Sequence, residues 1–176
     1  MISTPRLLLR AWKDSDREPF ARLNCDPKVM KFFQAPLSPS ESDGLVDRIN
    51  AHLNEHGFTF FAAELKDDGA FIGFIGIARP TFKAHFTPCV EIGWRLARPY
   101  WNLGLATEGA QAVLRYGFEQ LKLAEIVSFT VAANLRSRRV MEKIGMTYDP
   151  AEYFDHPNLP AGHPLSRHVL YRIAAR

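Results

Sequence analysis

Residues 94–109 read Trp94-Arg95-Leu96-Ala97-Arg98-Pro99-Tyr100-Trp101-Asn102-Leu103-Gly104-Leu105-Ala106-Thr107-Glu108-Gly109. This order predicts a strand, a turn around Pro99, and a loop of small residues that opens directly into a helix. A helix begins with about four N–H groups that have no intrahelical partner, and its dipole is positive at the same end. The loop is therefore a candidate phosphate-binding site, with an ordinary strand-to-helix turn as the alternative.

Small residues in this loop would let a pyrophosphate approach the backbone. Gly104 and Ala106 carry little or no side chain, and Thr107 adds a hydroxyl donor. Two familiar phosphate motifs are excluded. No Lys-Ser or Lys-Thr pair follows a glycine here, and Leu103 and Ala106 break the G-x-G-x-x-G fingerprint of dinucleotide-binding folds.

The loop resembles the coenzyme A pyrophosphate loop of the GCN5-related N-acetyltransferase (GNAT) superfamily. That family has Gln or Arg, then x-x-G-x, then Gly or Ala. The segment Trp101-Asn102-Leu103-Gly104-Leu105-Ala106 fits this pattern except at Trp101. A tryptophan there, followed by G-x-A-T-E, looks like the RimJ/RimL-like ribosomal-protein N-acetyltransferase branch.

Three further segments carry the resemblance, in the family's order. They are Thr4–Arg10, Glu91–Leu96, and Asn134–Met146, which matches N-x-x-S-x-x-V-x-E-K-x-G-M. The match covers most of residues 4–149. It implies one GNAT domain over residues 1–176, with an α+β fold in which helices flank a mixed, mostly antiparallel sheet of about seven strands.

Periodicity along the chain predicts elements compatible with this fold. The expected strands are 6–12, 60–65, 71–79, 90–96, 126–131, 147–154 and 168–173. The expected helices are 15–23, 40–56, 106–121 and 135–144. Asp14 or Ser15 is expected to cap the first helix, and Ser15 and Glu18 have the spacing of a capping box. Gly57 and Gly145 are expected to end the second helix and the last.

Composition is that of an ordinary globular enzyme. A net charge of +3 is too small to indicate direct nucleic-acid binding, and the chain has no membrane-spanning apolar run. The N-terminus shows no signal peptide, which favours a cytoplasmic location. Cys25 and Cys89 have no disulfide or metal spacing and are expected to be small packing residues, not acyl carriers.

Glu91 is the first candidate for a general base. Strand alternation puts Glu91, Gly93 and Arg95 on one face, so the carboxylate shares its face with a residue that leaves room for a ligand. The resemblance implies that Glu91 draws the amine proton, through a water molecule. The alternative is a solvated strand carboxylate, paired or not with Arg95.

Asn134 and Ser137 lie three residues apart where a strand passes into a helix. Asparagine is a favoured N-cap, so one interpretation is purely structural. The resemblance implies that Asn134 holds the pantetheine arm and that Ser137 lies near the sulfur and protonates the thiolate. Tyr148 or Tyr153 is the alternative general acid.

The resemblance also assigns the rest of the coenzyme site. The backbone of Trp94, Arg95 and Leu96 would bind pantetheine as a pseudo-strand and supply the oxyanion donor. The loop would hold the pyrophosphate through Asn102, Leu103, Gly104, Leu105, Ala106 and Thr107. Among the nearby arginines, Arg136 at the helix start is the best candidate for the phosphates, with a solvated basic surface as the alternative.

Histidines 156, 163 and 168 lie in a Pro/Gly-rich segment, residues 155–168. Their spacing matches no common zinc pattern, so no metal is expected. The segment and the aromatic pair Phe32-Phe33 are expected to border the acceptor site, although Phe32-Phe33 also fits a core role.

The sequence therefore predicts an acetyl-CoA-dependent N-acetyltransferase that acts directly on a primary amine. The branch resemblance points to a protein N-terminal amine as the acceptor. A small-molecule amine, another acyl-CoA, or a non-catalytic acyl-CoA-binding sensor are the alternatives. A homodimer is left open.

Overall fold

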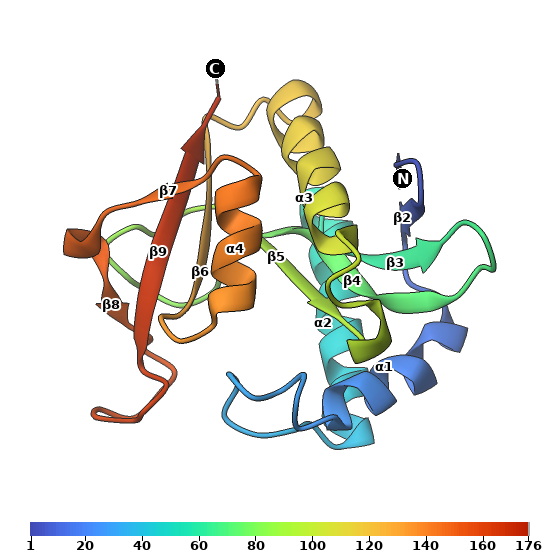
Figure 1. Cartoon of the computed structure of the whole chain (residues 1–176), viewed down its shortest axis with the longest axis horizontal. Helices are drawn as coiled ribbons and strands as arrows, with labels where there is room; N and C mark the ends of the chain where they lie inside the picture. The colour runs from blue at the N-terminus through green and yellow to red at the C-terminus, as the bar shows by residue number, and fades with distance from the viewer. Residues whose placement is uncertain (176) are drawn as a thin grey trace.

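The computed structural model describes residues 1–175 and contains one nine-stranded sheet (Figure 1). The strand order is β1-β2-β3-β4-β5-β6-β9-β7, and β8 also pairs with β9. All pairs are antiparallel except β5 with β6. The strands are β1 Ile2–Ser3, β2 Leu7–Arg10, β3 Phe60–Leu65, β4 Phe71–Ala78, β5 Glu91–Leu96, β6 Glu125–Val131, β7 Thr147–Tyr148, β8 Phe154–Asp155 and β9 Arg167–Ala174.

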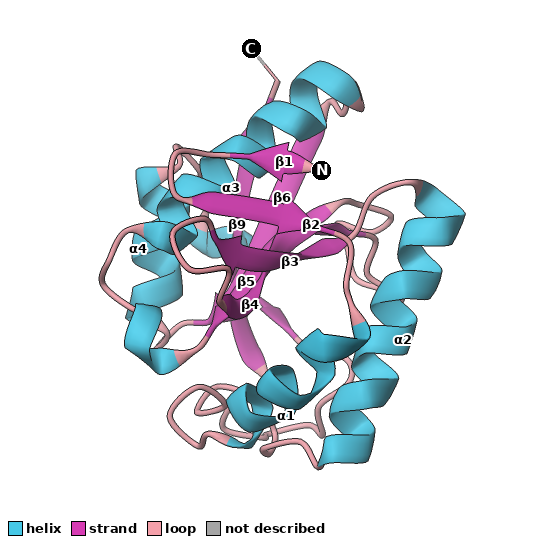
Figure 2. Ribbon diagram, turned by 90° about the vertical axis from the view of Figure 1, so that its right-hand side faces the viewer, coloured by secondary structure: helices cyan, strands magenta, loops and turns pink. Residues whose placement is uncertain are grey.

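Helices cover both faces of the sheet (Figure 2). They are α1 Arg17–Cys25, α2 Pro39–His56, α3 Leu105–Arg115 and α4 Leu135–Lys143. Helices α3 and α4 lie on one face, and α1 and α2 lie on the other. The expected α+β fold with a mixed, mostly antiparallel sheet is confirmed. The two strands beyond the expected seven come from β1 and from the division of the segment 147–154.

Two apolar cores hold these layers together. The larger core includes Ile75, Ile92 and Val113, and it joins the sheet to α3 and α4. The smaller core includes Phe20 and Ile49, and it joins the sheet to α1 and α2. Burial of each such side chain contributes roughly 1.5–3 kcal/mol, so packing on both faces fixes the strands that carry the site.

Helix α2 begins and ends nearly where the sequence predicted. Ser38 accepts a hydrogen bond from the backbone of Glu41, whose side chain accepts one from the backbone of Ser38, so the helix starts one residue before Ser40. Gly57 ends it with φ 77°, a left-handed conformation that favours glycine.

The predicted Ser15–Glu18 capping box of the first helix is wrong. Residues Asp14–Asp16 form a 3₁₀ turn, and the backbone N–H of Lys13 donates to the Asp16 carboxylate at 2.8 Å. Asp16 also binds the buried Arg10 guanidinium through two hydrogen bonds. The Asp16 carboxylate, held by the buried Arg10 of β2, therefore accepts the backbone hydrogen bond at this turn.

Two further boundaries differ from the sequence prediction. The predicted helix 106–121 is α-helical only to Arg115 and continues as a π-helical turn over Tyr116–Gln120. The predicted strand 147–154 is broken by a 3₁₀ turn, Pro150–Glu152, and leaves only β7 and β8. Proline donates no backbone hydrogen bond, so it interrupts the ladder.

Candidate active site

Strands β5 and β6 pair at only one position and then diverge (Figure 1). Glu91 is in register with Val127, the Val127 N–H donates to the Val90 carbonyl, and Ser128 Oγ donates to the Ile92 carbonyl. No strand pairing with β6 follows along the described part of β5. The two strands of this parallel pair therefore separate toward their carboxyl ends.

Backbone alternation along β5 decides which of its N–H and C=O groups face β6. The carbonyls of Val90 and Ile92 point toward β6, so the backbone groups of Trp94 and Leu96 point the same way. The backbone of Arg95 points to β4, where Arg95 is in register with Phe74. Trp94 and Leu96 thus turn main-chain groups toward β6 where the strands have separated, and of these groups the Leu96 carbonyl accepts from the Trp101 indole.

The loop before α3 has the conformation that a phosphate cradle needs. Asn102 and Gly104 both have positive φ, 61° and 79°, and α3 begins at Leu105. The first hydrogen bond of the helix is donated by Glu108 to the Gly104 carbonyl. The N–H groups of residues 105–107 therefore precede the helical ladder and are available to an anion.

A polar cluster from the N-terminus fixes this loop. Arg6 donates from Nη1 to the Leu103 carbonyl at 2.9 Å and from Nε to the Glu108 carboxylate at 2.7 Å. Thr4 Oγ1 donates to the same carboxylate at 2.6 Å. Their separation of about a hundred residues explains why the sequence did not reveal this support.

The start of α4 follows β6, the strand from which β5 separates. Asn134 Oδ1 caps the helix by accepting from the Ser137 N–H, and Asn134 Nδ2 donates to Ser137 Oγ at 3.1 Å and Thr130 Oγ1 at 3.0 Å. Ser137 Oγ therefore acts as an acceptor toward Asn134, and its own hydrogen is free for another partner.

Arg136 connects the start of α4 to the loop before α3. Its guanidinium lies 4.8 Å from the centre of the Trp101 ring. Trp101 Nε1 in turn donates to the Leu96 carbonyl at 2.7 Å, which ties the loop to the end of β5. Trp101, the residue that departs from the loop pattern, thus holds an arginine of α4 next to the loop before α3.

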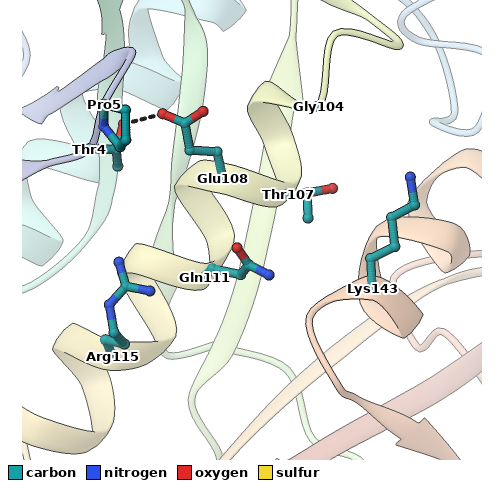
Figure 3. Close-up of a pocket in the computed structure, with 8 residues that line it drawn as sticks. All are labelled: Thr4, Pro5, Gly104, Thr107, Glu108, Gln111, Arg115 and Lys143. Atoms are coloured by element: carbon teal, nitrogen blue, oxygen red, sulfur yellow. Dashed lines mark hydrogen bonds between the residues drawn. The ribbon is translucent and has the colours of Figure 1, made fainter.

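A cavity of about 410 Å³ runs beside the first turns of α3 (Figure 3). Its lining includes Gly104 before α3, Thr107, Gln111 and Arg115 from α3, and Lys143 from the end of α4. Figure 3 shows the Thr107 side chain on the side of α3 that faces Lys143. Gln111, Arg115 and Lys143 were not predicted as site residues, because only the packing of α4 near α3 brings them together.

Glu91 lies at a second cavity, of about 280 Å³, on the face covered by α1 and α2. Phe60, Phe82, Phe129 and His156 are among its lining residues. Desolvation raises the pKa of the Glu91 carboxyl to about 8. A carboxylate with this pKa can accept a proton near neutral pH.

The alternative of a Glu91–Arg95 ion pair is not found among residues 1–175. Arg95 instead donates from Nη1 to the Asn24 side chain at 2.7 Å, and its guanidinium lies 4.2 Å from the centre of the Phe33 ring. Phe33 is 43% exposed, so this half of the expected Phe32-Phe33 border lies at the surface.

The tyrosines considered as acids lie elsewhere. Tyr148 stacks on Tyr171 at 4.8 Å, and Arg138 lies over its ring. Tyr153 contacts Tyr148 and packs at the edge of the larger core. Neither lines one of the two cavities described. Ser137, by contrast, lies at the start of α4 in contact with Asn134.

The cysteines differ from each other in environment. Cys25 is exposed, so its expected packing role is wrong. Burial, together with the charge of Glu91, raises the pKa of the Cys89 thiol to about 11. A thiol with that pKa is a poor nucleophile.

The Pro/Gly-rich segment 155–168 contributes to the Glu91 cavity through His156 and Asn158. Among residues 1–175, no group of three or more His, Cys, Asp or Glu side chains is arranged to hold a metal ion. No helix in that range is long and apolar enough to cross a membrane.

Comparisons with known proteins agree on the family. Residues 6–147 match the acetyltransferase (GNAT) domain family. The chain is 34% identical over 172 residues to the uncharacterized N-acetyltransferase YnaD of Bacillus subtilis (strain 168), covering 98% of this chain and 95% of that protein.

A second relative is the FsC-acetyl coenzyme A-N(2)-transacetylase of Aspergillus fumigatus, 32% identical over 168 residues, with 92% of this chain and 71% of that protein covered. A crystal structure of a GNAT-family acetyltransferase from Bacillus anthracis superposes with a TM-score of 0.79 at 30% identity, covering 98% of this chain and 97% of that chain. This chain belongs to the GNAT family of acetyltransferases.

Proposed function

We propose that this chain transfers an acetyl group directly from acetyl-CoA to a primary amine. The observation that carries this proposal is the free helix start at 105–107, which follows the carboxyl end of β5 where that strand has separated from β6. One feature suits a pyrophosphate, and the other suits an extended pantetheine arm. Their adjacency gives one path for the whole coenzyme.

The coenzyme fits the groups on this path. The pyrophosphate would accept hydrogen bonds from the N–H groups at Leu105, Ala106 and Thr107, with Gly104 allowing close approach. The pantetheine would pair with the backbone of Trp94 and with the Leu96 N–H, since the Leu96 carbonyl accepts from the Trp101 indole. Asn102 and Leu103 would contact the coenzyme between its pyrophosphate and its pantetheine arm.

Positive charge lies where the phosphates of the nucleotide end would be. Arg136, at the start of α4, lies over the ring of Trp101. Arg115 and Lys143 line the cavity beside α3. Cationic side chains bind phosphate oxygens through charge-assisted hydrogen bonds, so these three would supplement the backbone contacts.

The reaction would use groups on β5 and at the start of α4. Glu91 would accept the amine proton, through a bound water, so that the free amine attacks the thioester carbonyl. A backbone N–H of β5, at Trp94 or Leu96, would donate to the developing oxyanion. Ser137, whose hydrogen is not used by Asn134, would donate to the departing thiolate.

Two acceptor classes follow from different observations. The resemblance to the RimJ/RimL-like branch favours a protein N-terminal amine. The limited volume of the Glu91 cavity, about 280 Å³, favours a small-molecule amine. A longer acyl-CoA and a non-catalytic sensor are further alternatives, and Glu91 at the cavity argues against a sensor. A homodimer stays a prediction, which sedimentation would check.

Calorimetric titration of the purified chain with acetyl-CoA tests the proposal, with ATP and NAD as controls. Selective micromolar binding of acetyl-CoA is expected, followed by thiol release when an amine is added. Failure to bind acetyl-CoA would refute the proposal. Binding without thiol release across protein N-terminal peptides and small amines would identify a sensor instead.

A further inference from the structure

The cavity at Glu91 combines apolar walls with a basic rim. Its aromatic wall is built by Phe60 of β3, Phe82 of the loop after β4, and Phe129 of β6. Phe82 packs edge-on against Phe129 with ring centres 5.5 Å apart, and lies 4.6 Å from the ring of His156. These rings form a surface that suits a flat apolar group.

Two arginines line the same cavity, Arg48 from α2 and Arg79 from the end of β4. Both residues are exposed, and neither has a carboxylate within ion-pair distance among residues 1–175. Their charges are therefore not neutralised by the described part of the chain. They can attract an anionic group on a molecule that enters the cavity.

The histidines of the cavity add no positive charge. His52 Nε2 lies 3.0 Å from the Arg79 N–H and must accept from it, so Nδ1 carries the proton that is donated to the Phe58 carbonyl. His156 Nδ1 accepts from the Asn158 N–H. Burial lowers the pKa of both imidazoles, which keeps them neutral.

Glu91 is thus the one acidic residue among those that line the cavity, and the lining also includes two arginines without a carboxylate partner among residues 1–175. A polyamine carries several positive charges and would need further carboxylates to receive the charges beyond the reacting amine. The lining of this cavity offers two arginines instead, so it favours an acceptor that carries a negative charge away from the reacting amine.

We infer that the acceptor is a small primary amine attached to an apolar or aromatic body that carries an anionic group. The amine would lie at Glu91, the body against Phe82 and Phe129, and the anion at Arg48 and Arg79. This inference rests on the proposed acetyl transfer at Glu91, and it adds the chemistry of the molecule that receives the acetyl group.

Three matched amines test the inference. 4-(2-Aminoethyl)benzoate carries the anion, 4-(2-aminoethyl)benzamide is its neutral analogue of the same shape, and spermidine is the polyamine. We expect kcat/KM with acetyl-CoA to be about tenfold higher for the benzoate than for the benzamide, since each exposed rim charge contributes up to roughly fivefold. Spermidine should be the poorest acceptor.

Variants at the rim identify the cause. In Arg48→Gln and Arg79→Gln, the ratio of benzoate to benzamide kcat/KM should fall, and in the double variant it should approach one. Added salt should reduce the ratio in the original chain but not in the double variant. Arg22→Gln on α1, an exposed arginine outside the cavity, is the matched control and should leave the ratio unchanged.

The outcomes separate this inference from the proposed function. Equal kcat/KM for benzoate and benzamide, or a preference for spermidine, would overturn the inference while acetyl transfer stands. A benzoate preference that survives in the double variant would also overturn it. Absence of acetyl-CoA binding would refute the proposed function itself.

Discussion

The guanidinium of Arg136 lies 4.8 Å from the centre of the Trp101 ring, and the Trp101 indole donates to the Leu96 carbonyl. One aromatic side chain thereby connects the end of β5, the loop before α3 and the first turn of α4. The loop pattern that this chain resembles has glutamine or arginine where this chain has Trp101. Here a cation reaches the same region from α4 and is oriented by the ring.

Arg136→Gln should raise KM for acetyl-CoA about five- to tenfold and leave kcat nearly unchanged, because Arg136 would contact phosphate and not the reacting atoms. Steady-state kinetics with varied acetyl-CoA measure this. Arg22→Gln serves as the control for loss of one surface charge. An unchanged KM in Arg136→Gln would assign Arg136 to a structural role on Trp101.

The rate of acetyl transfer should depend on ionisation of Glu91. Because the Glu91 pKa is about 8 and a general base acts when deprotonated, kcat/KM should rise with pH and level off above about pH 8. Glu91→Gln should lower kcat/KM by about 10²–10⁴-fold and abolish this limb. A Glu91→Gln variant with normal turnover and the same pH profile would exclude Glu91 as the base.

The same carboxyl should make stability depend on pH. The Glu91 pKa is about 8 in the folded chain and near its ordinary 4.5 when unfolded, so the folded state holds the proton more tightly. Its contribution to stability is present below pH 4.5 and is lost as pH rises through 8.

Glu91→Gln removes that dependence. We expect the free energy of unfolding at pH 9 to be higher in the variant by roughly 2–4 kcal/mol, with little difference at pH 4. Urea denaturation at the two pH values measures it. A difference of equal size at both would trace the effect to packing.

Ser137→Ala should slow turnover with little change in acetyl-CoA affinity, because the serine would donate only to the departing thiolate. Asn134→Ala should act differently. It removes the helix cap and the contacts to Ser137 and Thr130, so unfolding stability should fall by about 1 kcal/mol and KM for acetyl-CoA should rise. Loss of acetyl-CoA affinity in Ser137→Ala with normal turnover would reassign the serine to binding.

Asn24 should be more important for stability than the arginine it holds. Asn24 is fully buried, accepts from Arg95 and donates to Ser42, and Arg95 Nε has no partner among residues 1–175. Asn24→Ala leaves the half-buried Arg95 guanidinium and the buried Ser42 hydroxyl without this partner and should cost about 2–3 kcal/mol. Arg95→Met removes the charge but leaves the buried Asn24 carbonyl oxygen without its donor, so it should cost about 1 kcal/mol, less than Asn24→Ala.

Thermal or urea unfolding of both variants checks this order. If Arg95→Met destabilised the chain as strongly as Asn24→Ala, the packing of Arg95 between Phe33 and Phe74 would be the larger contribution.

Local sequence patterns predicted most of the elements. Alternation gave the strands around Glu91 and Ile126, helical spacing gave α2 and α3, and glycine ended α2 where a left-handed residue is needed. These patterns depend on neighbours within a few residues. Predictions failed where a contact outside the local pattern intervened, as where the Asp16 carboxylate binds Arg10 of β2 and accepts from the backbone of Lys13.

For the site, the sequence by itself determined the chemical groups: the small-residue loop at 102–107, the Asn134–Ser137 spacing, and a carboxylate at 91. It also determined the family, through motifs in a fixed order. Tertiary structure alone decided where β5 and β6 part and that Arg136 reaches Trp101. It also decided that Arg48 and Arg79 share a cavity with Glu91. The physical reason is that charge and hydrogen-bond complementarity depend on distance in space, and packing of helices on both faces of the sheet sets those distances.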